Sequence, residues 1–392
     1  MESSVPQKVR VLIIGQTPPP YGGQALSIQR LVTANFDDIE IHHVRMHYSR
    51  TFTEVGRFKI RKVFHLFRIL LESVYKAVRY KIDVIHYPPG AERIPLIRDI
   101  FTLLILRLLS KRIVLIFHAS GLSEEVSKWR GLLLWLFKKA FYYVDAGVQT
   151  SALNPPDAAF VHAKKTYVVA NGIPDEFPRW QNAPKLNTVP IVLYVGVVRR
   201  DKGINVLLES ASILKARGLM FSVKIVGEFV SAGYRNELER EIANRLLGDV
   251  IQFTGPRVGD EKWILYRQAD VFCYPTFAPF ESFGNVLLEA MMFELPVVST
   301  RWRGIPSIVE EGVTGFLVAI QSPEELAERL EILLRDADLR ATMGQKGRER
   351  YLHYFTKERY LQGLRRVFIE VANSNETAQF TRRTEKHPSL VQ

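Results

Sequence analysis

The sequence predicts an α/β protein built from two doubly wound parallel-sheet domains. Its 392 residues exceed the size of a usual single core, so two domains of roughly 180 residues are expected. Short apolar runs of strand length alternate regularly with longer segments of helical periodicity, which is the pattern of parallel α/β sheets. Residues 174–190 hold four prolines and several polar residues, as a linker would. We therefore predict one domain over residues 1–180 and another over residues 187–356.

The first domain is expected to begin with a buried strand over residues 9–15, a Pro-Gly loop and a helix. The loop contains Gly22 and Gly23 but neither GxGxxG nor GxxxxGK[ST]. The sequence therefore lacks the main motifs for binding a hydride cofactor or for P-loop phosphate binding. His86 and His118 both follow β-branched runs, which places both at carboxyl ends of strands, where open α/β sheets bind ligands. The other elements expected here are helices 24–34, 58–80, 94–109 and 131–142 and strands 84–87, 113–117, 146–149 and 167–170.

The first domain carries most of the positive charge. Residues 1–180 contain 25 Lys and Arg against 15 Asp and Glu, so this half faces an anionic partner or has a solvated basic surface. The helix over residues 58–80 is strongly amphipathic, and we expect its apolar face to be buried and its basic face to lie outside, on an anionic membrane or in solvent. The apolar face has Ile60, Val63, Phe64, Phe67, Leu71, Val74 and Val78, and the basic face has Arg61, His65, Arg68, Lys76 and Arg79.

Cysteine content and hydropathy bear on location. The single cysteine, Cys273, lies in an apolar strand, which excludes a disulfide framework and fits a reducing compartment. The first residues lack the basic start and cleavage site of a signal peptide. No apolar run reaches the roughly 18 residues of a membrane span. We therefore expect a cytoplasmic protein.

The second domain is expected to open with a strand over residues 191–196 and a basic loop over residues 197–203. Arg199, Arg200 and Lys202 crowd the end of this strand and the start of the next helix, where the growing charge of a leaving diphosphate could be stabilised. A solvated basic turn is the alternative. The other elements expected before residue 270 are helices 204–216, 234–246 and 260–269 and strands 221–226 and 251–254.

Residues 269–299 are expected to form a strand, a proline-broken loop, a helix and a second strand. Ser282 is expected to cap a helix that begins near Phe283, whose unpaired amides would form an anion site. Gly284 would let a ligand approach closely. Glu281 and Glu289 would lie about 12 Å apart along continuous helix, which suits an elongated ligand.

The string Glu-Ser-Phe-Gly-Asn-Val-Leu-Leu-Glu-Ala at residues 281–290, with its E-x7-E spacing, resembles the retaining, GT-B-fold glycosyltransferases of family 4 (glycosyl transferases group 1). Gly196, Lys202 and Gly203 match a second motif of that family, and the turn over residues 171–173 a third. The resemblance covers about residues 8–370. It implies two facing Rossmann-like domains with a cleft between them, with the helix over residues 357–372 crossing back onto the first. The tail from residue 373 lacks apolar periodicity and is expected to be disordered.

The resemblance also implies roles for individual residues. Glu281 would contact the donor sugar, Glu289 the ribose hydroxyls and Lys202 the diphosphate. The Arg that the family has after the first Gly is Val197 here, so Arg199 or Arg200 would supply that charge. His118 would touch the sugar near its reacting carbon. The remaining donor-binding residues would be Gly22, Gly23, Gly196, Gly203, Gly255, Val258, Ser282, Phe283, Gly284, Asn285 and Val286.

The implied activity is a metal-independent transfer of a sugar, with retention of configuration, from a nucleotide sugar to a glycan or lipid-linked acceptor in polysaccharide or glycoconjugate synthesis. A UDP-sugar is the first choice of donor and a GDP-sugar the second, without a separate cofactor. We reject a metal site at Asp336 and Asp338, which lie in a polar turn between helices far from the cleft loops in sequence. The alternatives are a nucleotide-sugar epimerase of the same fold and a non-enzymatic anion binder. Nucleic acid is not an expected partner, because no base-stacking motif is present.

Overall fold

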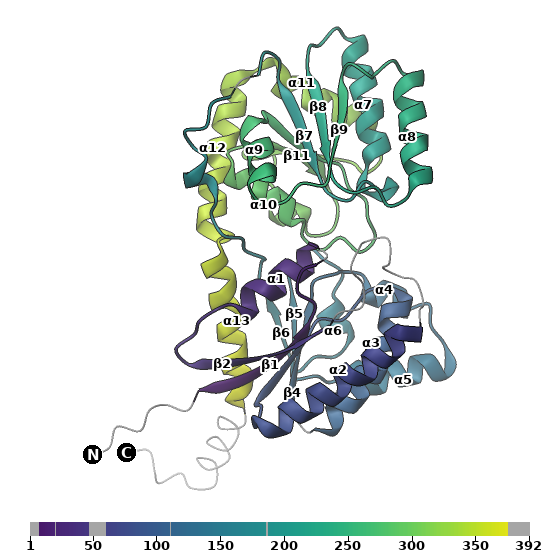
Figure 1. Cartoon of the computed structure of the whole chain (residues 1–392), viewed down its shortest axis with the longest axis vertical. Coiled ribbons are helices and arrows are strands. Elements are labelled where there is room, and N and C mark those ends of the chain that lie inside the picture. The colour runs from purple at the N-terminus through teal and green to yellow at the C-terminus, as the bar shows by residue number, and fades with distance from the viewer. Residues whose placement is uncertain (1–7, 20, 47–59, 110, 186, 375–392) are drawn as a thin grey trace, which may run out of the picture. The chain divides into compact units, whose positions relative to one another are not determined.

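The computed structural model describes residues 8–19, 21–46, 60–109, 111–185 and 187–374. Contacts divide this part of the chain into two compact units (Figure 1). The first unit contains the described residues up to Gln149, together with residues 155–169 and those from Leu361 onward. The second unit contains Thr150–Asn154 and Ala170–Tyr360. Of the tail predicted to be disordered, residues 375–392 lie outside the described residues.

The first unit is built on a six-stranded parallel sheet with the strand order β2-β1-β3-β4-β5-β6. The strand order reverses between β1 and β3, which are neighbours in the sheet. The chain adds β2 on one side of this pair and β4 on the other. The strands are β1 Val9–Gly15, β2 Ile39–Arg45, β3 Val84–Tyr87, β4 Arg112–Phe117, β5 Ala146–Gln149 and β6 Lys165–Val168. The helices that begin in or return to this unit are α1 Gly23–Val32, α2 Ile60–Arg79, α3 Arg93–Leu108, α4 Leu122–Val126, α5 Gly131–Phe141, α6 Asp157–Phe160 and α13 Lys357–Ala372.

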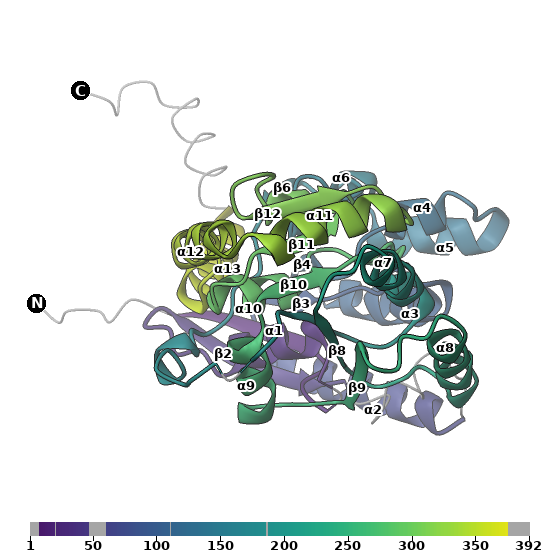
Figure 2. The same cartoon turned by 90° about the horizontal axis from the view of Figure 1, so that it is seen from above.

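The second unit repeats this architecture with the order β12-β11-β10-β7-β8-β9, again all parallel. Helix α7 packs against α11 and lies beside α8 (Figure 2). The strands are β7 Ile191–Val195, β8 Ser222–Val226, β9 Ile251–Gly255, β10 Val271–Tyr274, β11 Val297–Thr300 and β12 Gly315–Val318. The helices are α7 Ile204–Ala216, α8 Ala232–Asn244, α9 Asp260–Gln268, α10 Asn285–Met292, α11 Pro323–Arg335 and α12 Ala337–Tyr354. The two doubly wound parallel-sheet domains expected from the sequence are therefore present.

The central strands are continuous apolar runs because helices cover both faces of each sheet. All residues of β7 and β10 are buried, including Tyr194 and Tyr274. Each unit has its own core, since the buried apolar side chains form one cluster around the first sheet and another around the second. This separation agrees with the division of the described chain into two units.

Helix α2 differs from the prediction in the face that it buries. Its described side chains pack inward through Ile69, Leu70, Ser73 and Ala77, whereas other large apolar residues are exposed: Phe64, Phe67, Leu71, Tyr75 and Val78. Small residues let the helix lie close to the sheet, and periodicity alone shows that a face is apolar without showing what covers it. The expectation that the apolar face is buried is therefore wrong over residues 64–79, and the side chains of residues 60–63 lie outside the described ones.

Gly203, at the start of α7, marks a close approach between two loops of the second unit. Its φ of +80° is left-handed, and an added Cβ would lie 2.0 Å from the carbonyl oxygen of Pro275. Gly218 has nearly the same backbone, with φ of +75°, but open space around it.

We expect Gly218→Ala to lower the free energy of unfolding by about 1–2 kcal/mol through backbone strain alone. Gly203→Ala should add about 1–3 kcal/mol of overpacking to the same strain. Urea unfolding of both variants measures this difference. Equal losses would show that the two loops can move apart at no cost.

Candidate functional site

Two loops of the second unit leave adjacent strands at the point where the strand order reverses. The chain continues from β7 into residues 196–203 and from β10 into residues 275–284, and β7 and β10 are paired in the sheet. Open α/β sheets bind ligands at the carboxyl ends of strands at such a reversal. The loops are also joined directly, because Phe277 N–H donates to the carbonyl oxygen of Asp201 at 2.8 Å. The candidate site is built on these two loops.

Helix α10 begins two residues later than predicted. Gly284, with φ of +85°, is the N-cap residue, Asn285 is the first helical residue, and no side chain caps this end. The prediction that Ser282 caps a helix starting at Phe283 is therefore wrong, and a left-handed glycine makes the entry turn instead. Ser282 and Phe283 are both buried.

The first turn of α10 leaves backbone donors available. Leu287 N–H is bonded to the carbonyl oxygen of Gly284, but the N–H groups of Asn285 and Val286 have no acceptor among the described residues. The positive end of the helix dipole lies behind them. This end of α10 could therefore bind an anion, although through fewer amides than the sequence predicts.

A buried ion pair joins the two loops. Lys202 Nζ lies 2.6 Å from Glu281 Oε2, and both side chains are largely buried. Tyr274, at the end of β10, bridges them: its hydroxyl accepts from Lys202 Nζ at 3.0 Å and donates to Glu281 Oε2 at 2.8 Å. Sequence reasoning missed Tyr274, whose one signal was its place directly before Pro275 at the end of an apolar strand.

The charges and the burial of this cluster shift the pKa values of Glu281 and Tyr274. Burial favours the neutral form of Glu281, but the charge of Lys202 and hydrogen bonds from Lys202 and Tyr274 outweigh it, so the pKa of Glu281 is lowered from its ordinary value. Burial, together with the negative charge of Glu281, raises the pKa of Tyr274 well above its usual range. Glu281 is therefore an anion, Lys202 provides its counter-charge, and Tyr274 keeps its proton.

Glu289 belongs to a second buried cluster, one helix turn further along α10. Its carboxylate accepts from Lys262 Nζ at 2.7 Å and from the Tyr266 hydroxyl at 2.8 Å. The residue is buried rather than an ordinary exposed helix position. Lys262 and Tyr266 lie on α9, and no spacing in the sequence connects them to Glu289.

Arg199 and Arg200 point to different neighbours. Arg199 Nε lies 2.5 Å from Asp201 Oδ1, and its positive charge acts on Tyr274, within the ion-pair cluster. Arg200 pairs with Glu237 of α8, and its guanidinium lies 5.6 Å from the centre of the Tyr234 ring. Arg200 is therefore held toward α8, whereas Arg199 is paired with Asp201 of its own loop.

The other predicted residues of the second unit lie at the same edge of its sheet. Gly196 follows β7 directly, and its carbonyl oxygen lies against Gly227, where an added Cβ would be 1.8 Å away. Gly255 ends β9 with φ of +72°, two strands from β7, and Val258 is exposed in the loop that follows. A close backbone approach is therefore present at Gly196 but not at Gly255, which has open space around it.

The predicted residues of the first unit also gather at carboxyl ends of strands. His118 directly follows β4 and is half-buried, and burial, aided by the charge of Arg30, lowers its pKa to about 4. His86 lies within β3, and complete burial, with the charge of His118 as a smaller cause, lowers its pKa to about 3. Gly22 is the N-cap of α1 and Gly23 its first residue. Both histidines are therefore neutral at neutral pH.

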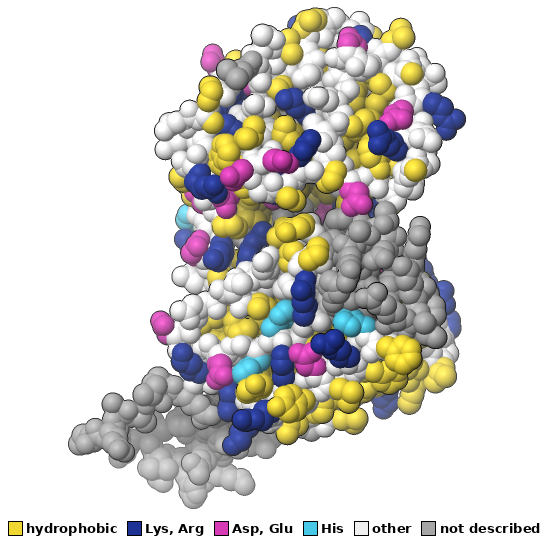
Figure 3. Space-filling view, in the orientation of Figure 1, with side chains coloured by type: hydrophobic (Ala, Val, Ile, Leu, Met, Phe, Trp, Pro, Cys, Tyr) yellow, Lys and Arg dark blue, Asp and Glu magenta, His cyan; other side chains and the backbone are white. Residues whose placement is uncertain are grey.

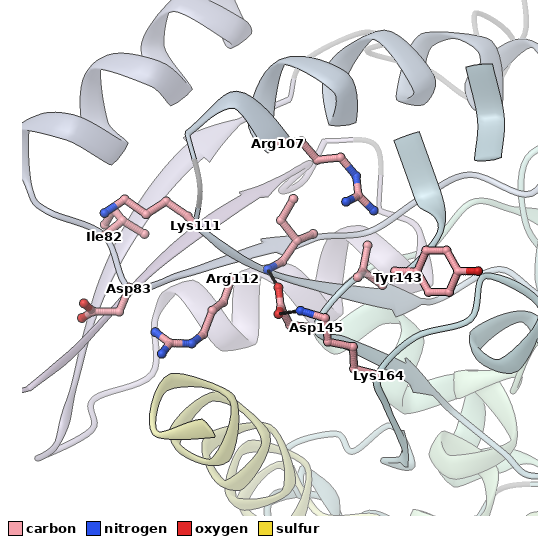
Figure 4. Close-up of a pocket in the computed structure, with 10 residues that line it drawn as sticks. Ile82, Asp83, Arg107, Lys111, Arg112, Tyr143, Asp145 and Lys164 are labelled. Carbon is pink, nitrogen blue, oxygen red and sulfur yellow. Dashed lines mark hydrogen bonds and ion pairs between the residues drawn. The ribbon is translucent and has the colours of Figure 1, made fainter. Parts of the chain in front are cut away.

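A polar hollow of the first unit lies at the opposite edge of its sheet, where strands begin (Figure 4). Several of its charged groups are already engaged: Lys164 Nζ lies 2.8 Å from Asp145 Oδ1, and Arg107 Nε donates to the carbonyl oxygen of Ala140 at 2.8 Å. Ligands of open parallel sheets bind at the other edge. We therefore do not regard this hollow as the functional site.

The described residues contain neither a metal-binding cluster nor a membrane-spanning helix. Within the described ranges, no group of three or more His, Cys, Asp and Glu side chains could hold a metal ion. Asp336, rejected above as a metal ligand, caps α12 by accepting from Leu339 N–H at 2.8 Å. No described helix is both long enough and apolar enough to cross a membrane.

Comparison with known proteins places this site in context. Residues 176–350 match the family described as Glycosyl transferases group 1. The capsular polysaccharide biosynthesis glycosyltransferase CapM of Staphylococcus aureus is 30% identical over 181 residues, which are 44% of this chain and 44% of CapM. The chain thus spans less than half the length of this relative.

Solved structures extend the likeness to nearly the whole chain. Sucrose-phosphate synthase from Thermosynechococcus elongatus has a TM-score of 0.70 at 21% identity, covering 94% of this chain and 100% of that one. HepE of Anabaena in complex with UDP has a TM-score of 0.68 at 19% identity, covering 92% and 100%. HepE has also been solved with UDP-glucose. These likenesses show that the fold is of the GT-B type, as predicted.

Removing the cation of the buried pair should reverse the way in which the contribution of Glu281 to the free energy of unfolding depends on pH. In the wild type the pKa of Glu281 is lowered from 4.5, so its stabilising contribution is present above that value and is lost as the pH falls through the folded pKa. In Lys202→Met the carboxylate stays buried without its counter-charge. The free energy of unfolding should then fall by about 3–5 kcal/mol at neutral pH and by less in mild acid, where Glu281 takes up a proton.

Urea unfolding at both pH values measures this, and Lys202→Met/Glu281→Gln should recover most of the loss. Two results would contradict this role of the pair. One is an equal loss of unfolding free energy at the two pH values in Lys202→Met, and the other is no recovery in the double variant.

Proposed function

We propose that the protein is a retaining, metal-independent glycosyltransferase that moves a sugar from a nucleotide sugar to a glycan or lipid-linked acceptor. The observation that carries the proposal is the buried Lys202–Glu281 pair, bridged by Tyr274, on the two loops that flank the uncapped start of α10. It places a cation, a carboxylate and unpaired amides at one ligand-binding edge. The match of residues 176–350 to the glycosyltransferase family supports it.

Charge stabilisation of the leaving diphosphate follows from this arrangement. Lys202 and the amides of Asn285 and Val286 would bind the diphosphate oxygens, and their fixed positive charge would favour the bond-breaking step without a metal ion. Arg199 is the better replacement for the Arg missing at Val197, because its charge acts on Tyr274 while Arg200 is held by α8. Binding of the donor would draw Lys202 from Glu281 toward the phosphates.

The two glutamates would divide the donor between them. Glu289 would accept hydrogen bonds from the ribose hydroxyls, with Lys262 and Tyr266 holding its carboxylate in position. Glu281, freed from Lys202, would contact the sugar. His118 would offer that sugar a neutral imidazole, because its pKa of about 4 keeps it uncharged at neutral pH. Gly22, Gly23, Gly196 and Gly255, together with Val258, would leave room for the sugar and the base.

A UDP-sugar is the first choice of donor and a GDP-sugar the second, and no separate cofactor is proposed. The structural likeness to HepE, solved with UDP and with UDP-glucose, supports this order. The likeness to CapM supports a role in polysaccharide or glycoconjugate synthesis. We further propose a cytoplasmic protein that meets its acceptor at an anionic membrane surface, because its one cysteine, Cys273, is a buried thiol and its amino-terminal half is basic.

Thermal unfolding with UDP, GDP, ADP and dTDP, and with the matching sugar nucleotides, tests the proposal. At about 100 times Kd the correct nucleotide should stabilise the protein by about 2.7 kcal/mol. Glu289→Gln should weaken nucleotide and sugar nucleotide alike by about 1.5–3 kcal/mol, whereas Glu281→Gln should affect mainly the sugar nucleotide.

Glu324→Gln, an exposed substitution on α11 of the same unit, is the control and should change neither affinity. An equal loss of affinity for the bare nucleotide in Glu281→Gln and Glu289→Gln would overturn the division of roles. Absence of stabilisation by any nucleotide would overturn the function itself.

A further inference from the structure

An apolar stripe runs along the outside of α2. Its members recur at helical spacing on one face, and each is between 61 and 72% exposed: Phe64, Phe67, Leu71, Tyr75 and Val78. From Phe64 to Val78 the stripe covers about 21 Å of helix at about 1.5 Å per residue. Single exposed apolar residues are ordinary on protein surfaces, but a contiguous row of this kind indicates contact with a partner.

Neighbouring helices continue the apolar surface. Helix α3 packs against both α2 and α5, so the three form one layer over the sheet. On α3, Phe101 is 51% and Leu108 82% exposed, and on α5, Leu132 is 71% and Trp135 54% exposed. Figure 3 shows hydrophobic side chains, with Lys and Arg among them, over the part of the first unit where Figure 1 has α2.

The charges beside this stripe are positive. Arg68, Arg79 and Lys81 are exposed, and the one acidic residue in the sequence from 64 to 81, Glu72, is paired with Lys76 at 2.8 Å. Helix α5 has no acidic residue, and its exposed Lys138 and Lys139 follow Trp135, with Lys139 Nζ lying 5.8 Å from the centre of the Trp135 ring. The surface thus combines apolar side chains, an aromatic ring suited to a membrane interface and cations.

We propose that the outer face of α2, continued by α3 and α5, inserts its apolar side chains into the interfacial layer of an anionic lipid bilayer. Because the stripe extends along the helix, α2 would lie parallel to the bilayer, with its cations near lipid phosphates. This differs from attachment by charge alone, since large apolar side chains are exposed on α2 together with the basic ones. The inference deepens the membrane location given under the proposed function, and its tests do not depend on catalysis.

A second copy of the chain is a poorer occupant of this surface. A two-fold contact places the same patch on both partners, so Arg68, Arg79 and Lys81 would face an equally basic surface of the second copy. Anionic lipid supplies the missing negative charge.

A single label on α2 tests insertion directly. Cys273, the one natural cysteine, is buried, so Leu71→Cys can carry an environment-sensitive fluorophore, and Met220→Cys, an exposed site in the second unit, serves as the matched control. We expect the emission of the label at position 71 to shift to shorter wavelength with vesicles of equal parts phosphatidylcholine and phosphatidylglycerol. The label at position 220 should not respond, and pure phosphatidylcholine should give a weaker response.

Co-sedimentation with the same vesicles separates apolar from electrostatic contributions. Phe67→Ser/Leu71→Ser should weaken binding by about tenfold or more, because two large apolar side chains no longer leave water. Arg68→Gln/Arg79→Gln should weaken it at low salt and approach the wild type at high salt. Met220→Ser/Leu352→Ser, which changes exposed apolar residues elsewhere, should bind as the wild type does.

Nucleotide-dependent thermal stabilisation, measured on every variant, separates this inference from the proposed function. An unshifted label at position 71, or serine variants that bind vesicles normally, would overturn the inference while nucleotide stabilisation left the function standing. Self-association that the serine variants abolish, without vesicle binding, would assign the stripe to a second copy and would also overturn it. Vesicle binding without any nucleotide effect would keep the inference and remove the function.

Discussion

The buried pair of Lys202 and Glu281 is the interaction around which the candidate site is arranged. Neither charge would be stable alone in this position, because an unpaired buried ion loses its hydration without compensation. Tyr274 bonds both partners, and the close approach of Gly203 to Pro275 brings their loops together. The pair therefore holds a cation and an anion at the point where the strand order reverses. The phosphate groups of a ligand could bind the cation, and its hydroxyl groups could bind the anion.

The fold could be predicted from the sequence because each of its elements has a local cause. Continuous apolar runs such as those of β7 and β10 require cover on both faces, and their regular alternation with helices leads to parallel sheets. The orientation of α2 could not be predicted. Its periodicity defines an apolar face, but whether sheet or bilayer covers that face depends on side chains distant in sequence, and Ser73 and Ala77 make the closer fit to the rest of the unit.

The site was predictable only in part. The spacing of Glu281, Glu289, Lys202 and Gly203 was visible in the sequence, and the structure brings Glu281 and Lys202 into contact. Their supports were not visible: Tyr274, Lys262 and Tyr266 reach the glutamates from strand β10 and helix α9. The start of α10 was misplaced because Ser282 resembles a cap in sequence, whereas a left-handed Gly284 makes the turn. The choice between Arg199 and Arg200 likewise needed the position of α8.

A crystal structure of the protein with UDP would show whether Lys202 leaves Glu281 for the diphosphate. We expect the diphosphate to lie at the start of α10, in hydrogen-bond contact with Lys202, the amides of Asn285 and Val286, and Arg199. Glu289 should accept from the ribose hydroxyls. Arg200 should remain on Glu237. UDP bound elsewhere, for example in the polar hollow of the first unit, with Lys202 still paired to Glu281, would contradict it.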